Sequence, residues 1–415
     1  MKGLPGFRDF YPEPLPTKDS WSLDLRQYIF DTWRITAERY GFREYDGPPI
    51  EELELYTKKS GEEIVGQLYN FADKGNREVS LRPEMTPTLA RMAASHTRNY
   101  KKPIKWFSIP QLFRYERQQK GRLREHFQLN ADIIGEEHFS ADAELISLLI
   151  DTLRNLKLNK EDFFVRLSSR QAWQNFFEKN GGNQNDAYEF YQIIDKLDRE
   201  EPKVSNDKLA KMGFSYDQIN EFILEGKPTE ELSAIIENIE ARGLGDFIKI
   251  DYRIIRGLAY YTGPVYEAFD KHGKFRAIAG GGRYDHLINL VSGGKTSLPA
   301  LGFGMGDVVL TELLKERNLI PKLQQRIDAF VQIKDESLRN TSLGLIQQLR
   351  QAGLTTEYPL LKTKPDKQYK RAFELNAKWL ITIENDNQAA LKNIETREEQ
   401  IYSLDKVIGI VESNI

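Results

Sequence analysis

The residues best suited to chemistry lie between positions 107 and 135, in the run FSIPQLFRYERQQKGRLREHFQLNADIIG. Its two ends have the alternation of strands, in which successive side chains point to opposite faces. One face of the second strand carries an imidazole, two amides and a carboxylate, from His126, Gln128, Asn130 and Asp132. The other face carries only apolar side chains, from Phe127, Leu129, Ala131 and Ile133. We expect the apolar face to lie in a core and the polar face to bind or react.

The same run supplies cations for a polyanionic ligand. The first strand adds Arg114 and Glu116 on one face, and the joining loop adds four basic residues, Arg117, Lys120, Arg122 and Arg124. Arginine forks bind phosphate oxygens in pairs, so a nucleotide triphosphate is the simplest ligand for this surface. A solvated edge hairpin would carry similar charges, and the residues alone leave both interpretations open.

The composition limits the class of protein. A chain of 415 residues is too long for one compact core and predicts two or three domains. The formal net charge of −3 gives no overall attraction to nucleic acid, so any RNA contact has to come from local patches. There is no cysteine, and the five histidines lack metal-binding spacing, so we expect no structural metal site.

The N-terminal sequence MKGLPGFRDFYPE lacks the apolar segment of a secretory signal. No stretch approaches the roughly 18 uninterrupted apolar residues of a membrane-spanning helix. We therefore expect a cytoplasmic protein with no membrane partner.

Two elements ahead of the central run would help to position it. Residues 21–40 have apolar residues at helical spacing, and Gly41 would end that helix. The segment after it contains Pro48-Pro49 and is predicted to be extended. This helix and strand suit a dimer interface, although a monomeric core would show the same pattern.

Residues 67–84 predict a hairpin, followed by a helix with Thr86 as N-cap and Pro87 as its first residue. Glu84 would then lie at a strand end that faces a helix start, where functional side chains are often presented. Further on, residues 140–156 predict a helix capped by Ser140, and residues 171–250 a helical insertion with little chemistry.

From position 254 the sequence is again typical of strands, and the last strand of this stretch is predicted at residues 275–291. The three glycines Gly280 to Gly282 indicate either backbone that approaches a ligand closely or a tight packing turn. Residues 298–317 predict a glycine-rich strand entering a helix, a possible approach to phosphate.

The composition changes again after Pro321. Residues 326–385 predict a βαβαβ pattern, typical of a small α/β domain with a parallel or mixed sheet. One of its helices is locally basic, with Lys364, Lys367, Lys370 and Arg371. That helix face could bind RNA or could simply be solvated.

Several of these segments together resemble one family. FRYERQQKGRLREHFQ resembles motif 2 of class II aminoacyl-tRNA synthetases in its histidyl-specific form. IRGLAYYTGPVYE resembles the histidine-binding signature of histidyl-tRNA synthetases, and GGGRYD, LRPEMT and GLPGFRDFYPE are similar to other segments of that family. The resemblance extends over essentially the whole chain, and the C-terminal part is similar to a class IIa anticodon-binding module.

This resemblance implies an α/β protein with an α+β catalytic core, built on the class II antiparallel sheet flanked by helices. It implies a catalytic domain over residues 1–325, with the helical insertion at about 171–250, and an anticodon-binding domain over residues 326–415. The implied activity is that of an ATP-dependent ligase for L-histidine and tRNA(His), with Mg²⁺ on the phosphates and a homodimeric assembly.

The resemblance also implies roles for individual residues. Those expected at ATP are Arg114 on the α-phosphate, Glu116 on the adenine amino group, Arg122 on the outer phosphates and His126 against the adenine ring. Those expected at histidine are Glu84, Thr86 and Gln128 around the ammonium group, and Asp132, Tyr261 and Tyr284 around the imidazole. Arg256 and Arg114 are the expected catalytic residues, because Arg256 would lie beside the reacting carboxylate and α-phosphate.

The sequence departs from the family pattern at four positions. Ala259 replaces an aspartate of the commonest bacterial signature, and Val309 stands where motif 3 has an arginine. Asp132 is shorter than the usual glutamate, and His126 replaces a stacking phenylalanine. These variants resemble a divergent subgroup that includes plant organellar enzymes. The alternative is a non-catalytic relative, such as the regulatory subunit of ATP phosphoribosyltransferase. Val309 and Ala259 favour this alternative. It is opposed by the presence of Arg114, Glu116, Arg256 and the C-terminal domain.

Overall fold

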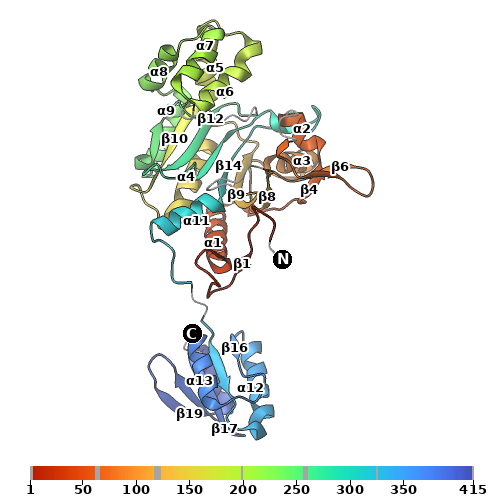
Figure 1. The fold of residues 1–415 in the computed structure, drawn as a ribbon, viewed down its shortest axis with the longest axis vertical. Coiled ribbons are helices and arrows are strands. Elements are labelled where there is room, and N and C mark those ends of the chain that lie inside the picture. Colours follow the sequence, from red (N-terminus) through yellow and green to blue (C-terminus); the bar gives the residue numbers. More distant parts are fainter. Residues whose placement is uncertain are drawn as a thin grey trace. The chain divides into compact units, whose positions relative to one another are not determined.

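The computed structural model describes residues 3–60, 66–115, 123–197, 200–255, 260–323 and 326–413. Contacts divide the chain into two compact units (Figure 1): Met1–Phe10 with Asp19–Ile320, and Tyr11–Lys18 with Pro321–Ile415. Each unit has its own sheet and buried core, so each is described by itself. Among the helices of the described ranges, none is long and apolar enough to cross a membrane.

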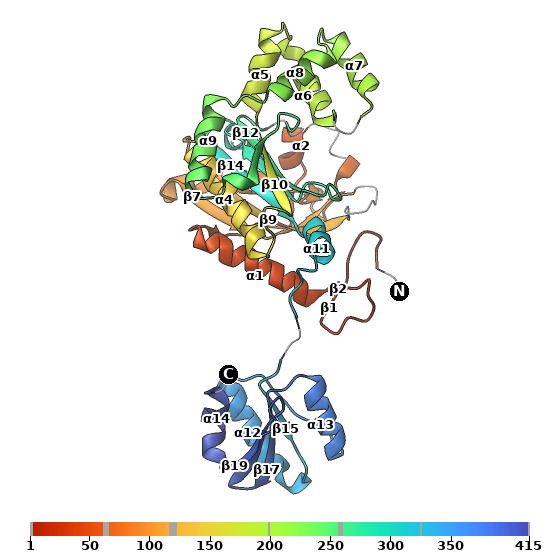
Figure 2. The same ribbon diagram turned by 90° about the vertical axis from the view of Figure 1, so that its left-hand side faces the viewer.

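A nine-stranded sheet runs through the larger unit (Figure 2). Its strand order is β11 (Ile248–Ile250), β10 (Phe163–Ser169), β12 (Pro264–Asp270), β13 (Ala279–Arg283), β14 (Ala300–Gly306), β9 (Glu125–Ile134), β7 (Ile104–Ser108) and β3 (Arg43–Glu44), with β8 (Gln111–Phe113) paired to one end of β9. The β10–β11 and β3–β7 pairs are parallel and the other pairs antiparallel. This arrangement confirms the predicted fold class.

Three helices cover one face of this sheet: α1 (Leu23–Arg39), α4 (Ser140–Asn155) and α9 (Glu230–Ala241). The apolar face of β9 packs beneath them, with Leu129, Ala131 and Ile133 buried. The Phe127 ring lies 5.1 Å from that of Phe30 in α1. The alternation along β9 therefore divides core from cavity as predicted, which leaves the polar face of β9 on the other side of the sheet.

The helix predicted at 21–40 is α1. Ser22 caps it, because its hydroxyl accepts a hydrogen bond from the Leu25 backbone N–H at 3.1 Å. Gly41 follows the helix with a φ of 78°, a left-handed conformation that glycine adopts at little cost.

A small sheet of order β4 (Ile50–Glu52), β6 (Glu78–Leu81) and β5 (Asn70–Ala72) contains the predicted hairpin, with α2 (Glu54–Ser60) and α3 (Thr86–His96) nearby. The predicted N-caps at Thr86 and Ser140 are wrong by one position, since each is the first residue of its helix. Their side chains have other partners: Ser140 Oγ lies 3.0 Å from His138 Nδ1, and Thr86 lines the cavity described below.

In the described residues of the insertion, four α-helices gather at one end of the larger unit in Figure 1: α5 (Arg170–Lys179), α6 (Ala187–Lys196), α7 (Pro202–Lys211) and α8 (Tyr216–Glu225). Their core is aromatic; for example, the Phe177 and Phe214 rings stack with centroids 5.2 Å apart. The chain then returns to the sheet, because α9 packs on α4 and β11 pairs with β10.

The predicted strand at 275–291 is wrong at its C-terminal end. Strand β13 stops at Arg283, and α10 (Leu287–Val291) follows. Leu287, Ile288 and Val291 have the spacing of a helix face, and they pack in a buried cluster with residues of α3. Beyond β14, α11 (Asp307–Glu316) begins at the predicted strand-to-helix junction.

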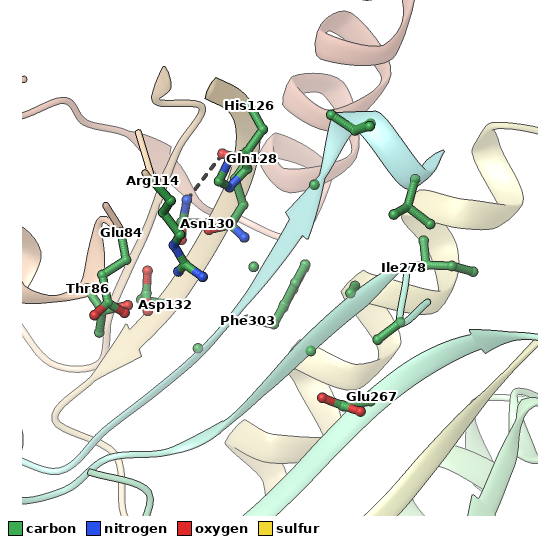
Figure 3. Close-up of a pocket in the computed structure, with 18 of the residues that line it drawn as sticks. Glu84, Thr86, Arg114, His126, Gln128, Asn130, Asp132, Glu267, Ile278 and Phe303 are labelled. Carbon is green, nitrogen blue, oxygen red and sulfur yellow. Dashed lines mark hydrogen bonds between the residues drawn. The ribbon is translucent and has the colours of Figure 1, made fainter. Parts of the chain in front are cut away.

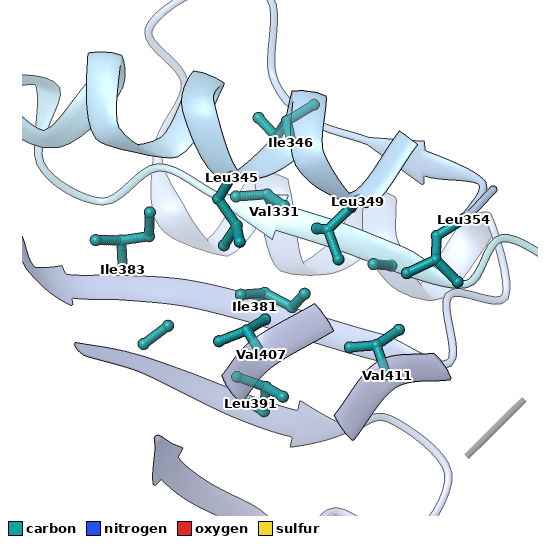
Figure 4. Close-up of a cluster of buried hydrophobic side chains, with 12 residues drawn as sticks. Val331, Leu345, Ile346, Leu349, Leu354, Ile381, Ile383, Leu391, Val407 and Val411 are labelled. Atoms are coloured by element: carbon teal, nitrogen blue, oxygen red, sulfur yellow. The ribbon is translucent and has the colours of Figure 1, made fainter. Parts of the chain in front are cut away.

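The smaller unit has a mixed sheet of order β16 (Thr356–Glu357), β15 (Ala329–Gln332), β17 (Trp379–Asn385), β18 (Gln388–Asn393) and β19 (Glu399–Ser403). Helices α12 (Arg339–Gln351), α13 (Pro365–Glu374) and α14 (Leu404–Glu412) accompany it. Figure 4 shows Leu345 and Leu349 of α12 and Val407 and Val411 of α14 meeting the sheet over Ile381. The βαβαβ core was predicted from the sequence, whereas β18, β19 and α14 were not.

Candidate active site

A cavity of about 490 Å³ lies on the polar face of β9. All four alternating side chains of that strand, His126, Gln128, Asn130 and Asp132, line it (Figure 3). Within this row, the Asn130 amide donates to the Gln128 carbonyl at 3.2 Å. A single strand thus presents an imidazole, two amides and a carboxylate to one cavity.

The facing wall comes from the junction between β6 and α3 and from the end of β8. Glu84 and Thr86 line the cavity from that junction. Arg114 reaches between Glu84 and the β9 side chains in Figure 3. Its Nε donates to the Pro83 carbonyl at 3.0 Å, and its backbone N–H donates to the Arg124 carbonyl at 2.9 Å. The first bond fixes the Arg114 guanidinium at the cavity wall, and the second fixes the backbone that carries it.

The deepest corner holds Asp132, Tyr261 and Tyr284, all of them buried. The Tyr284 hydroxyl donates to Asp132 Oδ1 at 2.5 Å. Burial raises the pKa of Asp132 to about 7, and this hydrogen bond opposes the rise. The corner can accept a hydrogen bond from a polar ring, because the Asp132 carboxylate lines the cavity there.

Two glycines of β14 make room for these side chains. A Cβ at Gly302 would lie 1.9 Å from Asp132 Oδ1, and one at Gly304 would lie 2.6 Å from Gln128 Cδ. In the neighbouring strand, Gly280 lines the cavity, whereas a Cβ at Gly281 would strike the Gly302 carbonyl at 2.2 Å. The three glycines are part of strand β13, so the interpretation as a tight packing turn is wrong, and the close approach to a ligand stays a prediction.

His126 contributes a neutral ring at neutral pH. Burial lowers its pKa to about 3, and the nearby charges of Arg114 and Arg8 lower it further. Val308 and Val309, at the start of α11, line the same cavity. This part of the site can hold a flat ring between uncharged groups.

Eight of the eleven predicted site residues lie in the described ranges, and all eight line this one cavity: Glu84, Thr86, Arg114, His126, Gln128, Asp132, Tyr261 and Tyr284. The other three, Glu116, Arg122 and Arg256, lie outside the described residues, as does Ala259.

Other lining residues were not predicted as site residues. Asn130 was placed on the polar face of the predicted strand but was given no role in the site. Glu267, Ile278 and Phe303 come from β12, the approach to β13, and β14, and Figure 3 shows them across the cavity from Arg114. Their positions depend on strand pairing between distant segments, for which a single sequence gives no signal; Glu267, for example, pairs with Gly280.

A buried ion-pair network supports the site from behind. Arg8 donates to Glu125 Oε1 at 2.6 Å and to Asp307 Oδ2 at 2.8 Å. The Phe127 backbone N–H donates to Asp307 Oδ1 at 2.9 Å. Arg8 thus ties the start of β9 to the start of α11, two elements that present cavity residues. No local sequence pattern predicts this role for Arg8, because Asp307 lies 299 positions away.

Comparisons with known proteins agree with this fold. The family model described as "Histidyl-tRNA synthetase" matches residues 25–307, and the model described as "Anticodon binding domain" matches residues 328–414. A histidine–tRNA ligase of Opitutus terrae is 39% identical, over 99% of this chain and 98% of its own length. The chloroplastic/mitochondrial histidine–tRNA ligase of Arabidopsis thaliana is 38% identical, over 91% of this chain and 79% of its own.

Among solved structures, a histidyl-tRNA synthetase from Nostoc sp. PCC 7120 superposes with a TM-score of 0.76 at 23% identity, over 97% of this chain and 98% of that one. The fold is that of a class II aminoacyl-tRNA synthetase with a C-terminal anticodon-binding domain. With family models that span most of the chain and relatives this similar over nearly its full length, the chain belongs to the histidyl-tRNA synthetase family.

Proposed function

We propose that the protein is a histidine–tRNA ligase. It activates histidine with ATP to histidyl-adenylate and pyrophosphate, and then transfers the histidyl group to the 3′-terminal adenosine of tRNA(His). The observation that carries this proposal is the cavity that joins the β9 row to Glu84, Thr86 and Arg114. Curated relatives named histidine–tRNA ligase, with 36–39% identity over nearly the whole chain, support it.

Histidine would occupy the deep end of the cavity. Glu84, Thr86 and Gln128 offer acceptors for its ammonium group, and Asp132, Tyr261 and Tyr284 would surround its imidazole. A site that pairs each polar group of its substrate strongly rejects analogues that lack one of them.

ATP would lie at the other end. His126 would stack on adenine, and Arg114 would bind the α-phosphate, at which the histidine carboxylate attacks as pyrophosphate leaves. A fixed cation at that phosphorus stabilises charge that develops in the transition state. The roles of Glu116 at adenine, Arg122 at the outer phosphates and Arg256 at the reacting centre remain predictions, since these residues lie outside the described ranges.

Mg²⁺ would accompany ATP. In the described ranges, no three His, Asp or Glu side chains gather as a metal site. Mg²⁺ is commonly held by one or two carboxylates together with substrate phosphates, and Glu267 is a cavity carboxylate that histidine does not require. Bound there, the ion would neutralise phosphate charge during the transfer.

We assign residues 1–325 to the catalytic domain, and residues 326–415 to recognition of the tRNA anticodon. The helical insertion predicted at about 171–250 corresponds to α5–α8, because α9 and β11 pack on or pair with the central sheet. On α13, Phe373 is 64% exposed among the basic residues of that helix. Exposed aromatic rings beside cations can stack on unpaired bases, which supports contact with a tRNA loop.

We further propose a cytoplasmic homodimer. Ile35 of α1 and Ile50 of β4 are 47% and 42% exposed, on the helix and strand whose sequence suits a dimer interface. Sedimentation velocity should show a dimer, and a stable, active monomer would contradict this proposal.

The non-catalytic alternative is not favoured. One solved structure, named as an ATP phosphoribosyltransferase regulatory subunit/histidyl-tRNA synthetase from Bacillus halodurans, has a TM-score of 0.70 at 21% identity, which shows a shared fold only. The curated relatives with the higher identities are ligases, and the anticodon-binding model matches residues 328–414.

Histidine-dependent exchange of pyrophosphate into ATP tests the function directly. We expect exchange with histidine and none above background with the other amino acids. Arg114→Ala should reduce it by roughly 10²–10³-fold, as expected for a lost transition-state donor. Exchange without preference for histidine, or none by the folded wild type, would contradict the proposal.

A further inference from the structure

Tyr284 and Tyr45 both pack beside the corner of the cavity that holds Asp132, and within the described residues they differ in their hydrogen bonds. Tyr284 donates to Asp132, as described above. Tyr45 packs in the same buried cluster as Tyr284. Its hydroxyl oxygen is buried and has no hydrogen-bond partner among the described protein groups. Leaving a buried hydroxyl unpaired costs roughly 1–3 kcal/mol, so such a group needs an explanation.

Strand pairing places Tyr45 on the same face of the sheet as Asp132. The Tyr45 backbone N–H donates to the Phe107 carbonyl at 2.9 Å, at the end of β3. Its ring packs on Trp106, with centroids 5.6 Å apart. Trp106 of β7 is the direct cross-strand partner of Asp132, and opposite residues of paired strands lie on one face. On β3 the cross-strand partner of Trp106 is Arg43, two residues before Tyr45, so Tyr45, Trp106 and Asp132 lie on one face of the sheet.

The hydroxyl and the carboxylate lie within electrostatic range of each other. Burial raises the pKa of Tyr45 well above its usual value, and the charge of Asp132 adds to the rise. The other charged or titratable groups around this corner are Arg82, Asp46, Glu84, Arg114, Tyr260, Tyr261 and Tyr284. Asp132 is deeply buried in the sheet and has one phenolic donor, so a second donor would help to keep it ionised.

We propose that Tyr45 is a positioning residue for histidine recognition: in the substrate complex its hydroxyl donates to Asp132, which holds the carboxylate ionised and directed at the imidazole N–H. This inference rests on the proposed function, since it takes histidine as the occupant of the cavity. Tyr45 does not line the cavity itself and acts through Asp132. A purely structural Tyr45 would contribute only its ring, which phenylalanine would replace.

Tyr45→Phe separates the two roles, because it keeps the ring and removes the hydroxyl. We expect the variant to be at least as stable as the wild type without histidine, since the lost hydroxyl is unpaired there. The KM for histidine in pyrophosphate exchange should rise roughly tenfold, the value of one hydrogen bond to a charged group, while the KM for ATP stays unchanged. Tyr191→Phe, in the insertion, controls for loss of a tyrosine hydroxyl elsewhere.

The pH dependence provides the second readout. Removing a donor from a carboxylate raises the carboxylate pKa. The ratio of histidine KM between variant and wild type should therefore be larger at pH 6–7 than at pH 9; the titration of free histidine cancels in that ratio. In an Asp132→Asn background, Tyr45→Phe should have little further effect, because the two residues act as one unit.

Each outcome decides a different point. A wild type without histidine-dependent exchange would remove the proposed function and this inference with it. An active wild type with an unchanged histidine KM and pH profile in Tyr45→Phe would overturn the inference alone. A Tyr45→Phe protein that is strongly destabilised without histidine would also overturn it, because the hydroxyl would then be bonded in the substrate-free fold.

Discussion

Gly302→Ala offers a sharp test of the histidine pocket, because the structure defines what the new methyl group would meet. The added carbon would lie 1.9 Å from Asp132 Oδ1, 2.7 Å from Asp132 Cγ and 2.9 Å from the Ala131 carbonyl oxygen. Gly302 and Asp132 are direct partners in the β14–β9 pair, so neither backbone can withdraw without breaking the sheet. The carboxylate therefore has to move.

Ordinary van der Waals contact requires the carboxylate to shift by about 1.5 Å. Displacing a positioning group by about 1 Å can cost roughly 100-fold. We expect kcat/KM for histidine in pyrophosphate exchange to fall about 100-fold, equivalent to ~2.7 kcal/mol, with the KM for ATP changed much less. Overpacking should also lower the free energy of unfolding by about 1–3 kcal/mol, which denaturant titration will measure.

Two other glycine substitutions calibrate the result. Gly304→Ala approaches the end of the flexible Gln128 side chain, so its effect on histidine should be smaller. Gly409→Ala, in α14, meets no atom within 4 Å and should leave exchange unchanged. If folded Gly302→Ala uses histidine within twofold of the wild type, Asp132 does not contact the substrate and the assignment of this corner is wrong.

Three further outcomes follow from the structure. Arg8→Met would leave Glu125 and Asp307 buried without the arginine that pairs with both. The free energy of unfolding, measured by denaturant titration, should therefore fall by roughly 3–5 kcal/mol. An unchanged denaturation midpoint would show that this ion-pair network does not stabilise the fold. The pKa of Asp132 is raised to about 7 in the folded protein, from about 3.9 in the unfolded chain. The stabilisation of the fold by protonated Asp132 is therefore complete below about pH 3.9 and is lost as the pH rises through about 7. Asp132→Asn should flatten this decline in the free energy of unfolding, which is at most about 1.4 kcal/mol per pH unit. Replacing Lys367, Lys370 and Arg371 by alanine should weaken tRNA charging and make its salt dependence shallower by roughly 0.7–0.9 per lost phosphate contact, with pyrophosphate exchange unchanged; equal charging by the variant would show that α13 does not face the tRNA.

The sequence predicted best what depends on short-range periodicity. Strand β9 was divided correctly into a buried and a cavity face, because alternate residues of a strand always separate in this way. The helix α1, the insertion helices and the βαβαβ core of the smaller unit followed from apolar spacing in the same way.

Features that join distant segments were missed. The Arg8–Asp307 pair spans 299 positions, and nothing near either residue indicates the other.

The short helix α10 was taken for strand because its five residues are too few to establish a helical period. Thr86 was taken for a cap because its residue type suits that role, although its side chain lines the cavity.

With ATP in the proposed position, the departure at position 309 would change how its phosphates are held. Val309 lines the cavity where the family resemblance predicts an arginine, and the nearby charge of Asp307 is buried against Arg8. Among the described lining residues Arg114 is the one cation, since His126 is neutral. The triphosphate would then depend on cations from the β8–β9 side, namely Arg114 and the predicted Arg122, and on Arg256. Loss of any one of them should therefore weaken ATP binding more here than in a relative that keeps an arginine at position 309.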